Sequence, residues 1–189
     1  VDSDKNLIAK WSPRKYTVTL NLDCSDTVTG FDKTSFQIGK DETYAAAGST
    51  ELGQTPTRTG YNFMGWYTDR NGQGDKIESN TSKKYGKTTD QILYAHWEAN
   101  KYTLTFKYAF PTPNAAWKNP DGSAQTTAPT DPSDMTNGAT YNSPYPALPT
   151  PTPSDIPYYA ADSTKKYTFE GWYDLEKDKI NPSDPTNNK

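Results

Sequence analysis

The sequence predicts a mainly β fold with little helix (α+β), arranged as two tandem units, and three observations support this prediction. Residues 92–97 and 101–106 restate residues 6–11 and 15–20, so that Trp11 recurs as Trp97, 86 positions later. Polar and apolar residues alternate through short segments, as they do in half-buried strands. Aromatic residues are frequent in an otherwise polar chain. Repeated units stack small cores of one kind, so a tandem array is the first architecture to consider.

A second block recurs with a different spacing. Residues 59–69 contain Gly-Trp-Tyr, and residues 166–174 contain it again, with Trp66 returning as Trp172, 106 positions later. The interval before this block is therefore 20 residues longer in the second unit. Only a few residues link the units near position 100, and such a short connection favours an elongated array.

Composition narrows the class of protein. The 189 residues carry 20 Lys+Arg against 23 Asp+Glu, a net charge of −3, which offers no basic surface for nucleic acid and no polybasic membrane anchor. Hydrophobic content is 32% and the mean hydropathy is −0.99, values that alone would suggest disorder. However, 5 Trp, 14 Tyr and 6 Phe can form small cores, because each buried ring removes a large area from water.

The single cysteine and the lack of long apolar runs bear on where the protein is located. Cys24 is alone, so it forms no intramolecular disulfide and no Cys-based metal site, and scarce cysteine fits many bacterial surface proteins. No apolar run approaches the roughly 18 residues of a membrane span, and Val1 is followed by charged residues rather than by a signal peptide. We expect a soluble, extracellular piece of a longer protein at the bacterial cell surface or cell wall, without membrane insertion.

Four strands are expected from alternation. Residues 14–23 direct Tyr16, Val18, Leu20 and Leu22 to one face, and residues 101–108 likewise direct Tyr102, Leu104, Phe106 and Tyr108 inward. Residues 61–67 are apolar on both faces, which suggests a central strand. Leu93, Ala95 and Trp97 mark another short strand.

The intervals between strands differ in the two units. Residues 42–48 contain three alanines before a glycine and favour a turn of helix, although the segment is too short for a firm helix. The second unit instead has a Pro-rich insert at about 110–165, which we interpret as an extended, polyproline-like loop because proline disfavours helix and central strand. The polar residues after Tyr67 predict a hairpin turn.

The repeats define three expected segments. Residues 1–14 contain a closing strand, at 4–11, of a preceding repeat; residues 15–100 form one complete module; residues 101–189 form a diverged module without its last strand. The simpler explanation of the orphan strand is that the chain boundaries are out of phase with the repeats. The alternative is that this strand fills the gap in a neighbouring chain, since open sheet edges favour strand addition.

The order of these blocks resembles a known family. Tyr-Thr-Val-Thr at 16–19, Thr-Gly-Tyr-x-Phe-x-Gly-Trp-Tyr-Thr-Asp at 59–69 and Leu-Tyr-Ala-x-Trp at 93–97 are similar to the Listeria–Bacteroides repeat, the B repeat of internalin B. Lys166 stands where the family usually has glycine. The resemblance implies small β-grasp-like modules, in which a four-stranded sheet packs on a short helical or loop segment. It also implies tandem display on a bacterial surface or secreted protein, and brings no catalytic residues.

Three tryptophans are candidate ligand contacts. Trp66 and Trp172 could form a sugar-stacking platform, but their recurrence at one repeat position favours core packing. Trp117 lies in the insert, outside the repeated pattern, where it either anchors the loop or offers a contact of its own.

Other candidate chemistry is weak. His96 occupies the position of Lys10 in the earlier copy, so we expect it to face solvent rather than act as a base or metal ligand. Asp69 opens a segment that resembles a calcium loop, but a polar hairpin turn explains it better because position 80 is Asn and not Glu. Cys24 has no adjacent base. Lys107 leaves open an isopeptide cross-link.

The predicted function is therefore non-enzymatic, without cofactor or metal. The leading hypothesis is a stalk, spacer or adhesion module of a bacterial surface protein, whose partners are neighbouring repeats and an unknown glycan or protein ligand of the host or surface. The alternative is a carbohydrate- or protein-binding module that uses exposed aromatics.

Overall fold

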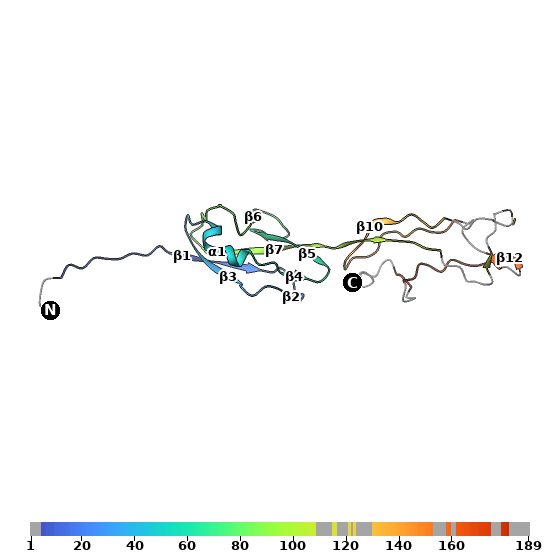
Figure 1. Ribbon diagram of the computed structural model, residues 1–189, viewed down its shortest axis with the longest axis horizontal. Helices are drawn as coiled ribbons and strands as arrows, with labels where there is room; N and C mark the ends of the chain where they lie inside the picture. Colours follow the sequence, from blue (N-terminus) through green and yellow to red (C-terminus); the bar gives the residue numbers. More distant parts are fainter. Residues whose placement is uncertain are drawn as a thin grey trace. The chain divides into compact units, whose positions relative to one another are not determined.

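The computed structural model describes residues 5–108, 115–116, 121, 123, 130–152, 158–159, 162–174 and 179–181. The chain divides into two compact units, Val1–Glu98 and Ala99–Lys189 (Figure 1). Each unit contains its own sheets, and the described residues of both are mainly β with one short helix. The predicted mainly β class is therefore confirmed.

The first unit is built on one mixed sheet beneath a helix. Its strands follow the order β2-β4-β5-β7-β1-β3, and β6 pairs with β5. β1 lies between β7 and the edge strand β3, antiparallel to β3 and parallel to β7. The elements are β1 (Lys15–Asn21), β2 (Val28–Thr29), β3 (Ser35–Gly39), α1 (Tyr44–Leu52), β4 (Thr57–Arg58), β5 (Tyr61–Tyr67), β6 (Lys76–Ile77) and β7 (Gln91–Ala99).

The predicted strands of the first unit form where the alternation places them. In β1 the side chains of Tyr16, Val18 and Leu20 are buried, whereas their neighbours are more exposed. Leu93 and Ala95 of β7 are buried in the same way. β5 has sheet neighbours on both sides, as its apolar faces predict.

The helix is longer than the sequence suggested. The turn expected at residues 42–48 is a helix that begins after Thr43 and continues to Leu52. The Oγ1 atom of Thr43 accepts a hydrogen bond from Ala46 N at 3.2 Å, which caps the first turn. Gly48 breaks the helical dihedrals (φ −137°, ψ 26°), and the chain resumes the helix beyond it. Packing on β3 supports a helix that local propensity alone made marginal.

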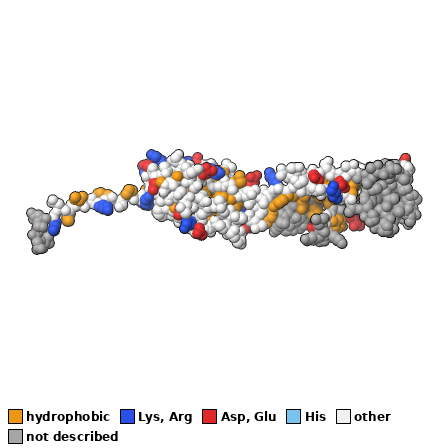
Figure 2. All heavy atoms as spheres, in the orientation of Figure 1, with side chains coloured by type: hydrophobic (Ala, Val, Ile, Leu, Met, Phe, Trp, Pro, Cys, Tyr) orange, Lys and Arg blue, Asp and Glu red, His pale blue; other side chains and the backbone are white. Residues whose placement is uncertain are grey.

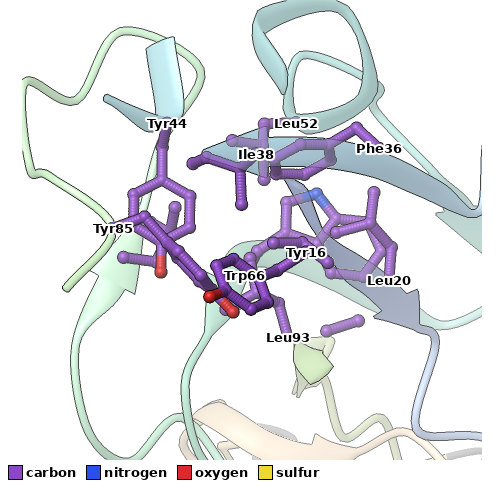
Figure 3. Packing of buried hydrophobic residues seen from close by; sticks show 12 residues of the cluster. Tyr16, Leu20, Phe36, Ile38, Tyr44, Leu52, Trp66, Tyr85 and Leu93 are labelled. Carbon is purple, nitrogen blue, oxygen red and sulfur yellow. The ribbon is translucent and has the colours of Figure 1, made fainter. Parts of the chain in front are cut away.

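The core of the first unit lies between α1 and the sheet (Figure 3). Its largest fully buried side chains are Trp66 and Tyr85, with Ile38 and Leu93 around them. Five of the twelve core residues are aromatic, which agrees with the small aromatic-rich core that the composition predicts.

The second unit contains two small sheets. β8 (Lys101–Leu104) pairs antiparallel with β10 (Met135–Thr140), and a separate sheet has the order β12-β11-β9. The elements of this sheet are β9 (Ala115–Ala116), β11 (Tyr158–Tyr159) and β12 (Asp162–Lys166).

The prediction of loop throughout the Pro-rich insert is therefore wrong in part. β10 lies within residues 110–165: its six residues contain no proline, so every residue can donate to a ladder, and β8 supplies the partner strand. Residues 144–152, which contain four of the five described prolines of the insert, form no regular element.

Two further expectations need correction. Residues 5–14 form no strand and are fully exposed, because a strand is stable only beside a partner. Tyr102, expected to point inward, is 48% exposed. Its counterpart in β1, Tyr16, packs against Tyr85 at a ring distance of 6.0 Å, whereas the hydroxyl of Tyr102 accepts a hydrogen bond from Asn100.

Candidate functional site

The most distinctive local structure is a hairpin built on Gly-Trp-Tyr. In the first unit, Trp66 lies opposite Ile77 and Tyr67 lies opposite Lys76 across β5 and β6. Gly65 has φ +122°, a conformation that disfavours side chains. A Cβ built on Gly65 would lie 2.6 Å from Lys76 Cε. The glycine therefore lets the aliphatic part of the lysine lie against the backbone.

The second unit repeats this arrangement. Tyr173 bridges to Lys179, and the Ile180 N–H donates to the Trp172 carbonyl at 2.9 Å. Gly171 has φ +130°, and its Cβ would lie 2.9 Å from Lys179 Cε. Two units that otherwise differ thus share one glycine conformation and one lysine contact.

Sequence reasoning missed the lysine of this hairpin, although a signal was present. Asp-Lys-Ile occurs at residues 75–77 and again at residues 178–180. This tripeptide recurs after 103 positions, whereas Gly-Trp-Tyr recurs after 106, because the connecting turn is three residues shorter in the second unit. A search at one constant spacing therefore overlooks it.

The Gly-Trp-Tyr segment of each hairpin contains the same pair of packed aromatic rings. Phe63 meets Trp66 edge to face, with ring centroids 5.3 Å apart and planes at 68°. Phe169 meets Trp172 at 5.5 Å and 70°. This geometry suits the quadrupoles of two aromatic rings. The repeated block therefore specifies a packing unit.

The three candidate tryptophans have different surroundings. Trp66 is 1% exposed, its Nε1 atom has no hydrogen-bond partner among the described residues, and it lies within the core in Figure 3. Its ring faces are therefore covered by protein. Trp172 is half-buried, and its Nε1 donates to the carbonyl of Pro149 at 2.8 Å. Trp117 lies outside the described residues.

A contact between Trp172 and Pro149 ties the Pro-rich insert to the second hairpin. The rings of Phe106 and Tyr108 lie 4.9 Å and 5.9 Å from that of Trp172. Part of the insert is thus anchored on an aromatic cluster by a hydrogen bond to a repeat residue.

Trp97 connects the end of β7 to the rest of the first unit. Its Nε1 donates to the Leu22 carbonyl at 2.8 Å, and its ring lies 5.3 Å from that of Phe63. The guanidinium of Arg58 lies 3.6 Å from the ring centroid of Tyr61 and pairs with Asp26 at 2.5 Å. The Arg58 guanidinium also lies 5.8 Å from the ring centroid of Trp97, so these contacts join β4, β5 and the end of β7.

An open groove of about 400 Å³ lies between the end of α1 and the hairpin. Leu52 and Met64 line it together with Trp66, and Lys76 pairs with Glu78 at 3.0 Å on its rim. Met64 is partly exposed there. Its lining also includes Gln54, Thr55, Ser79 and Asn80, so the groove is polar as well as apolar.

Tyr44 and Gln91 form a buried polar pair in the first unit. The Tyr44 hydroxyl donates to Gln91 Oε1 at 2.8 Å, and both side chains are buried. Burial raises the pKa of Tyr44 to about 12, and the neighbouring Tyr85 adds to the effect. Burial likewise raises the pKa of Tyr85. These phenols stay neutral at physiological pH and serve the core.

The remaining candidates have structural surroundings. His96 is half-buried, not fully solvent-facing as expected, because its ring packs on the turn at Gly72 and lies edge to face with Tyr67 at 5.6 Å. The segment that begins at Asp69 is a tight turn in which Asp69 N donates to the Gln73 carbonyl at 3.3 Å. No cluster of three or more His, Cys, Asp or Glu occurs among the described residues.

Lys107 and Cys24 complete the predicted set. The ammonium group of Lys107 pairs with Asp131 at 3.0 Å. The ion pair raises the pKa of Lys107, and the backbone N–H of Tyr108 and the same lysine lower the pKa of Asp131. Cys24 is a free, half-buried thiol.

Comparison with known proteins matches most of the first unit to one family. Residues 16–96 match the family model of the Listeria-Bacteroides repeat domain, which confirms the resemblance noted in the sequence over that span. No solved structure matches the chain. No helix among the described residues has the length and apolar character needed to cross a membrane.

Two proteins of Evansella cellulosilytica are similar to part of the chain. One carries the name of a predicted Gly-rich membrane protein and is 36% identical over 107 residues, which are 56% of this chain and 11% of that protein. The other carries the name of a predicted membrane protein and is 31% identical over 105 residues, which are 56% of this chain and 15% of that protein. The similar region is thus a small part of each relative.

Proposed function

We propose that this chain is a non-enzymatic repeat module of a bacterial cell-surface or secreted protein, in which it acts as a stalk or spacer and presents an adhesion element. The observation that carries this proposal is the recurrence of one hairpin, with its glycine, tryptophan and lysine, in two units. Each unit has its own aromatic cluster, so units can be added in series without a shared site. The repeat family and the membrane-protein names of the relatives support a surface role.

The proposed fold of each unit is β-grasp-like. In the first unit, β3 and β1 form an antiparallel hairpin, α1 follows, and β7 returns parallel to β1 at the centre of the sheet. β5 then flanks β7, giving the order β3-β1-β7-β5 with a helix between the halves. A small sheet of this kind places its first strand and its last strand side by side, and therefore suits a tandem arrangement.

Small-angle scattering of the 189-residue chain tests the stalk proposal. A compact globule of this length has a radius of gyration of about 16 Å. A serial arrangement of two units predicts a clearly larger value and a distance distribution with a long tail. A radius near the compact value would contradict the proposed spacer role.

The runner-up function is binding of a glycan or protein by exposed aromatics. Tyr173, which is half-exposed beside Trp172 in the second hairpin, favours it. Replacement of Tyr173 by alanine should abolish any signal on a glycan array, while Tyr67→Ala, the same position in the first unit, should retain it. Arrays that stay silent with the unaltered chain would remove this candidate.

A further inference from the structure

The Pro-rich insert contains a described segment, residues 144–152, whose exposure follows a period of three. This segment, which we call the proline strap, includes Pro-x-x-Pro at Pro146 and Pro149 and forms no regular element. Its partly buried side chains recur at every third position: Tyr145, Leu148 and Pro151. The residues between them are exposed, except Pro149. A polyproline helix has three residues per turn, so the strap presents one face of such a helix to the second unit.

An aromatic cluster of the second unit holds the strap. The Nε1 atom of Trp172 donates to the Pro149 carbonyl at 2.8 Å. The ring of Tyr108 stacks on that of Trp172, with centroids 5.9 Å apart and planes at 18°. Phe106 meets the Trp172 ring edge to face at 4.9 Å and is buried. We call these three aromatic residues the cradle.

The strap meets the same hairpin at a second point. Burial raises the pKa of Tyr145, and the charge of Asp174 adds to the effect. Asp174 follows Trp172 by two positions, and Tyr145 precedes Pro149 by four. The strap therefore extends along the hairpin from Tyr145 to Pro149.

The cradle has the chemistry of proline-rich recognition. A polyproline helix makes no hydrogen bonds within itself, so its carbonyls are free to accept from a side chain. Aromatic-lined grooves bind such segments because the helix is preformed and loses little entropy. The strap contains no charged residue, and Figure 2 shows apolar side chains gathered over the described part of this unit. Shape, apolar contact and the indole hydrogen bond, rather than charge, thus hold the strap.

The first unit shows that this contact is not general to the repeat. Trp66, at the repeat position of Trp172, is buried in a core that includes Leu52 of α1, and its Nε1 has no partner among the described residues. The interval before Gly-Trp-Tyr is 20 residues longer in the second unit, and it contains the strap. The acceptor for the indole N–H is therefore a feature of the insert.

We propose that the cradle is a binding site for uncharged peptides with the Pro-x-x-Pro pattern, and that the strap is its ligand within the same chain. The strap lies on the surface, because five of its nine residues are exposed, and it belongs to no strand ladder. It can therefore leave the cradle without breaking a sheet, and a separate peptide of the same pattern can take its place. The proposal does not rest on the stalk role.

Fluorescence anisotropy of a labelled peptide of residues 144–152, mixed with the 189-residue chain, tests the proposal. A tethered ligand acts at roughly millimolar effective concentration, so the unaltered chain should bind the peptide weakly. Leu148→Asp in the chain removes a partly buried contact of the strap and should tighten peptide binding about tenfold. Ala147→Asp is the matched control, since this neighbour is exposed, and should leave peptide binding as in the unaltered chain.

The same two changes made in the peptide should have the opposite effect. The peptide with Leu148→Asp should fail to bind the Leu148→Asp chain, whereas the peptide with Ala147→Asp should bind it. Trp172→Phe, added to the Leu148→Asp chain, should weaken binding of the unaltered peptide, because phenylalanine keeps a ring but cannot donate to the carbonyl. Raised salt should leave the affinity for the uncharged peptide unchanged.

Proton–nitrogen NMR of the unaltered chain gives a readout that does not depend on folding of a variant. Excess peptide should move the backbone amide signals of Leu148 and Thr150 to their positions in the free peptide, because the strap leaves the cradle. The indole signal of Trp66 in the first unit should stay in place. Strap signals that do not move, equal peptide binding by folded Leu148→Asp and Ala147→Asp chains, or undiminished binding after Trp172→Phe would overturn the proposal.

Discussion

The ring of Phe36 occupies the space in which Gly48 would carry a side chain. A Cβ built on Gly48 would lie 2.5 Å from Phe36 Cε2, far inside contact distance. The glycine thus lets α1 approach β3 closely, and it also accounts for the break in helical dihedrals at this residue. One residue therefore couples the geometry of the helix to the packing of the sheet.

Gly48→Ala should destabilise the first unit by about 1–3 kcal/mol, because overpacking displaces a core ring. Urea denaturation followed by tryptophan fluorescence measures the change. Gly86→Ala is the control, since a Cβ there meets nothing within 4 Å, and it should leave the midpoint nearly unchanged. Phe36→Leu replaces the ring by a smaller side chain and should relieve part of the cost of Gly48→Ala in a double-mutant cycle. If it does not, the contact with Phe36 is not the cause of the destabilisation.

Replacement of the hairpin glycines should weaken each unit separately. Gly65→Ala and Gly171→Ala force alanine into φ values of +122° and +130°, which costs of the order of 1–3 kcal/mol. Hydrogen–deuterium exchange with mass spectrometry should show faster exchange in the altered unit and unchanged exchange in the other. Equal loss of protection in both units would contradict independent units.

Alkaline pH should unfold the first unit by ionising its buried phenols. The folded-state pKa of Tyr44 is about 12, against an ordinary value of 10.0, so its contribution is fully present below pH 10 and is lost as pH rises toward 12. Tyr44→Phe should make the loss of stability with rising pH smaller. Part of the loss should remain, because Tyr85 also has a raised pKa. A series of denaturant midpoints from pH 8 to pH 12 measures the effect. An identical alkaline fall in the variant would count against this assignment.

Tyr44→Phe should also lower stability at neutral pH. The buried amide of Gln91 then loses the hydroxyl that donates to its Oε1, and an unsatisfied buried group costs about 1–3 kcal/mol. The double variant Tyr44→Phe/Gln91→Leu removes the amide as well and should recover part of the stability lost in Tyr44→Phe. Unfolding by urea at pH 7 distinguishes the two variants.

Trp97→Phe should cost about 1 kcal/mol in the first unit, because phenylalanine keeps a ring against Phe63 but cannot donate to the Leu22 carbonyl. Trp11→Phe is the matched control at the equivalent repeat position. In dilute solution it should leave unfolding unchanged, since Trp11 is exposed. Chemical denaturation at low protein concentration makes the comparison, and equal effects of the two variants would argue against the hydrogen bond.

Much of the candidate site could be predicted from the sequence, but its key contact could not. The recurrence of Trp66 at Trp172 indicated packing, and both rings do pack on a phenylalanine three residues earlier. The lysine contacts of Gly65 and Gly171 were hidden by the change of spacing between the units. The hydrogen bond from Trp172 to Pro149 joins residues 23 positions apart in the sequence. The segment between them has no periodic pattern, so no local sequence feature predicts this contact.

The sequence by itself determined which residues of β1 and β7 face the core, because alternation of side chains is a property of each strand alone. It also determined the mainly β class and carried the resemblance to the repeat family whose model matches residues 16–96. Only the tertiary structure decided that β1 pairs parallel with β7, that α1 extends past Gly48, and that β10 forms within a Pro-rich interval. The physical reason is that partners, close approaches and helix length depend on contacts between distant segments, and those contacts exist only once the chain has packed.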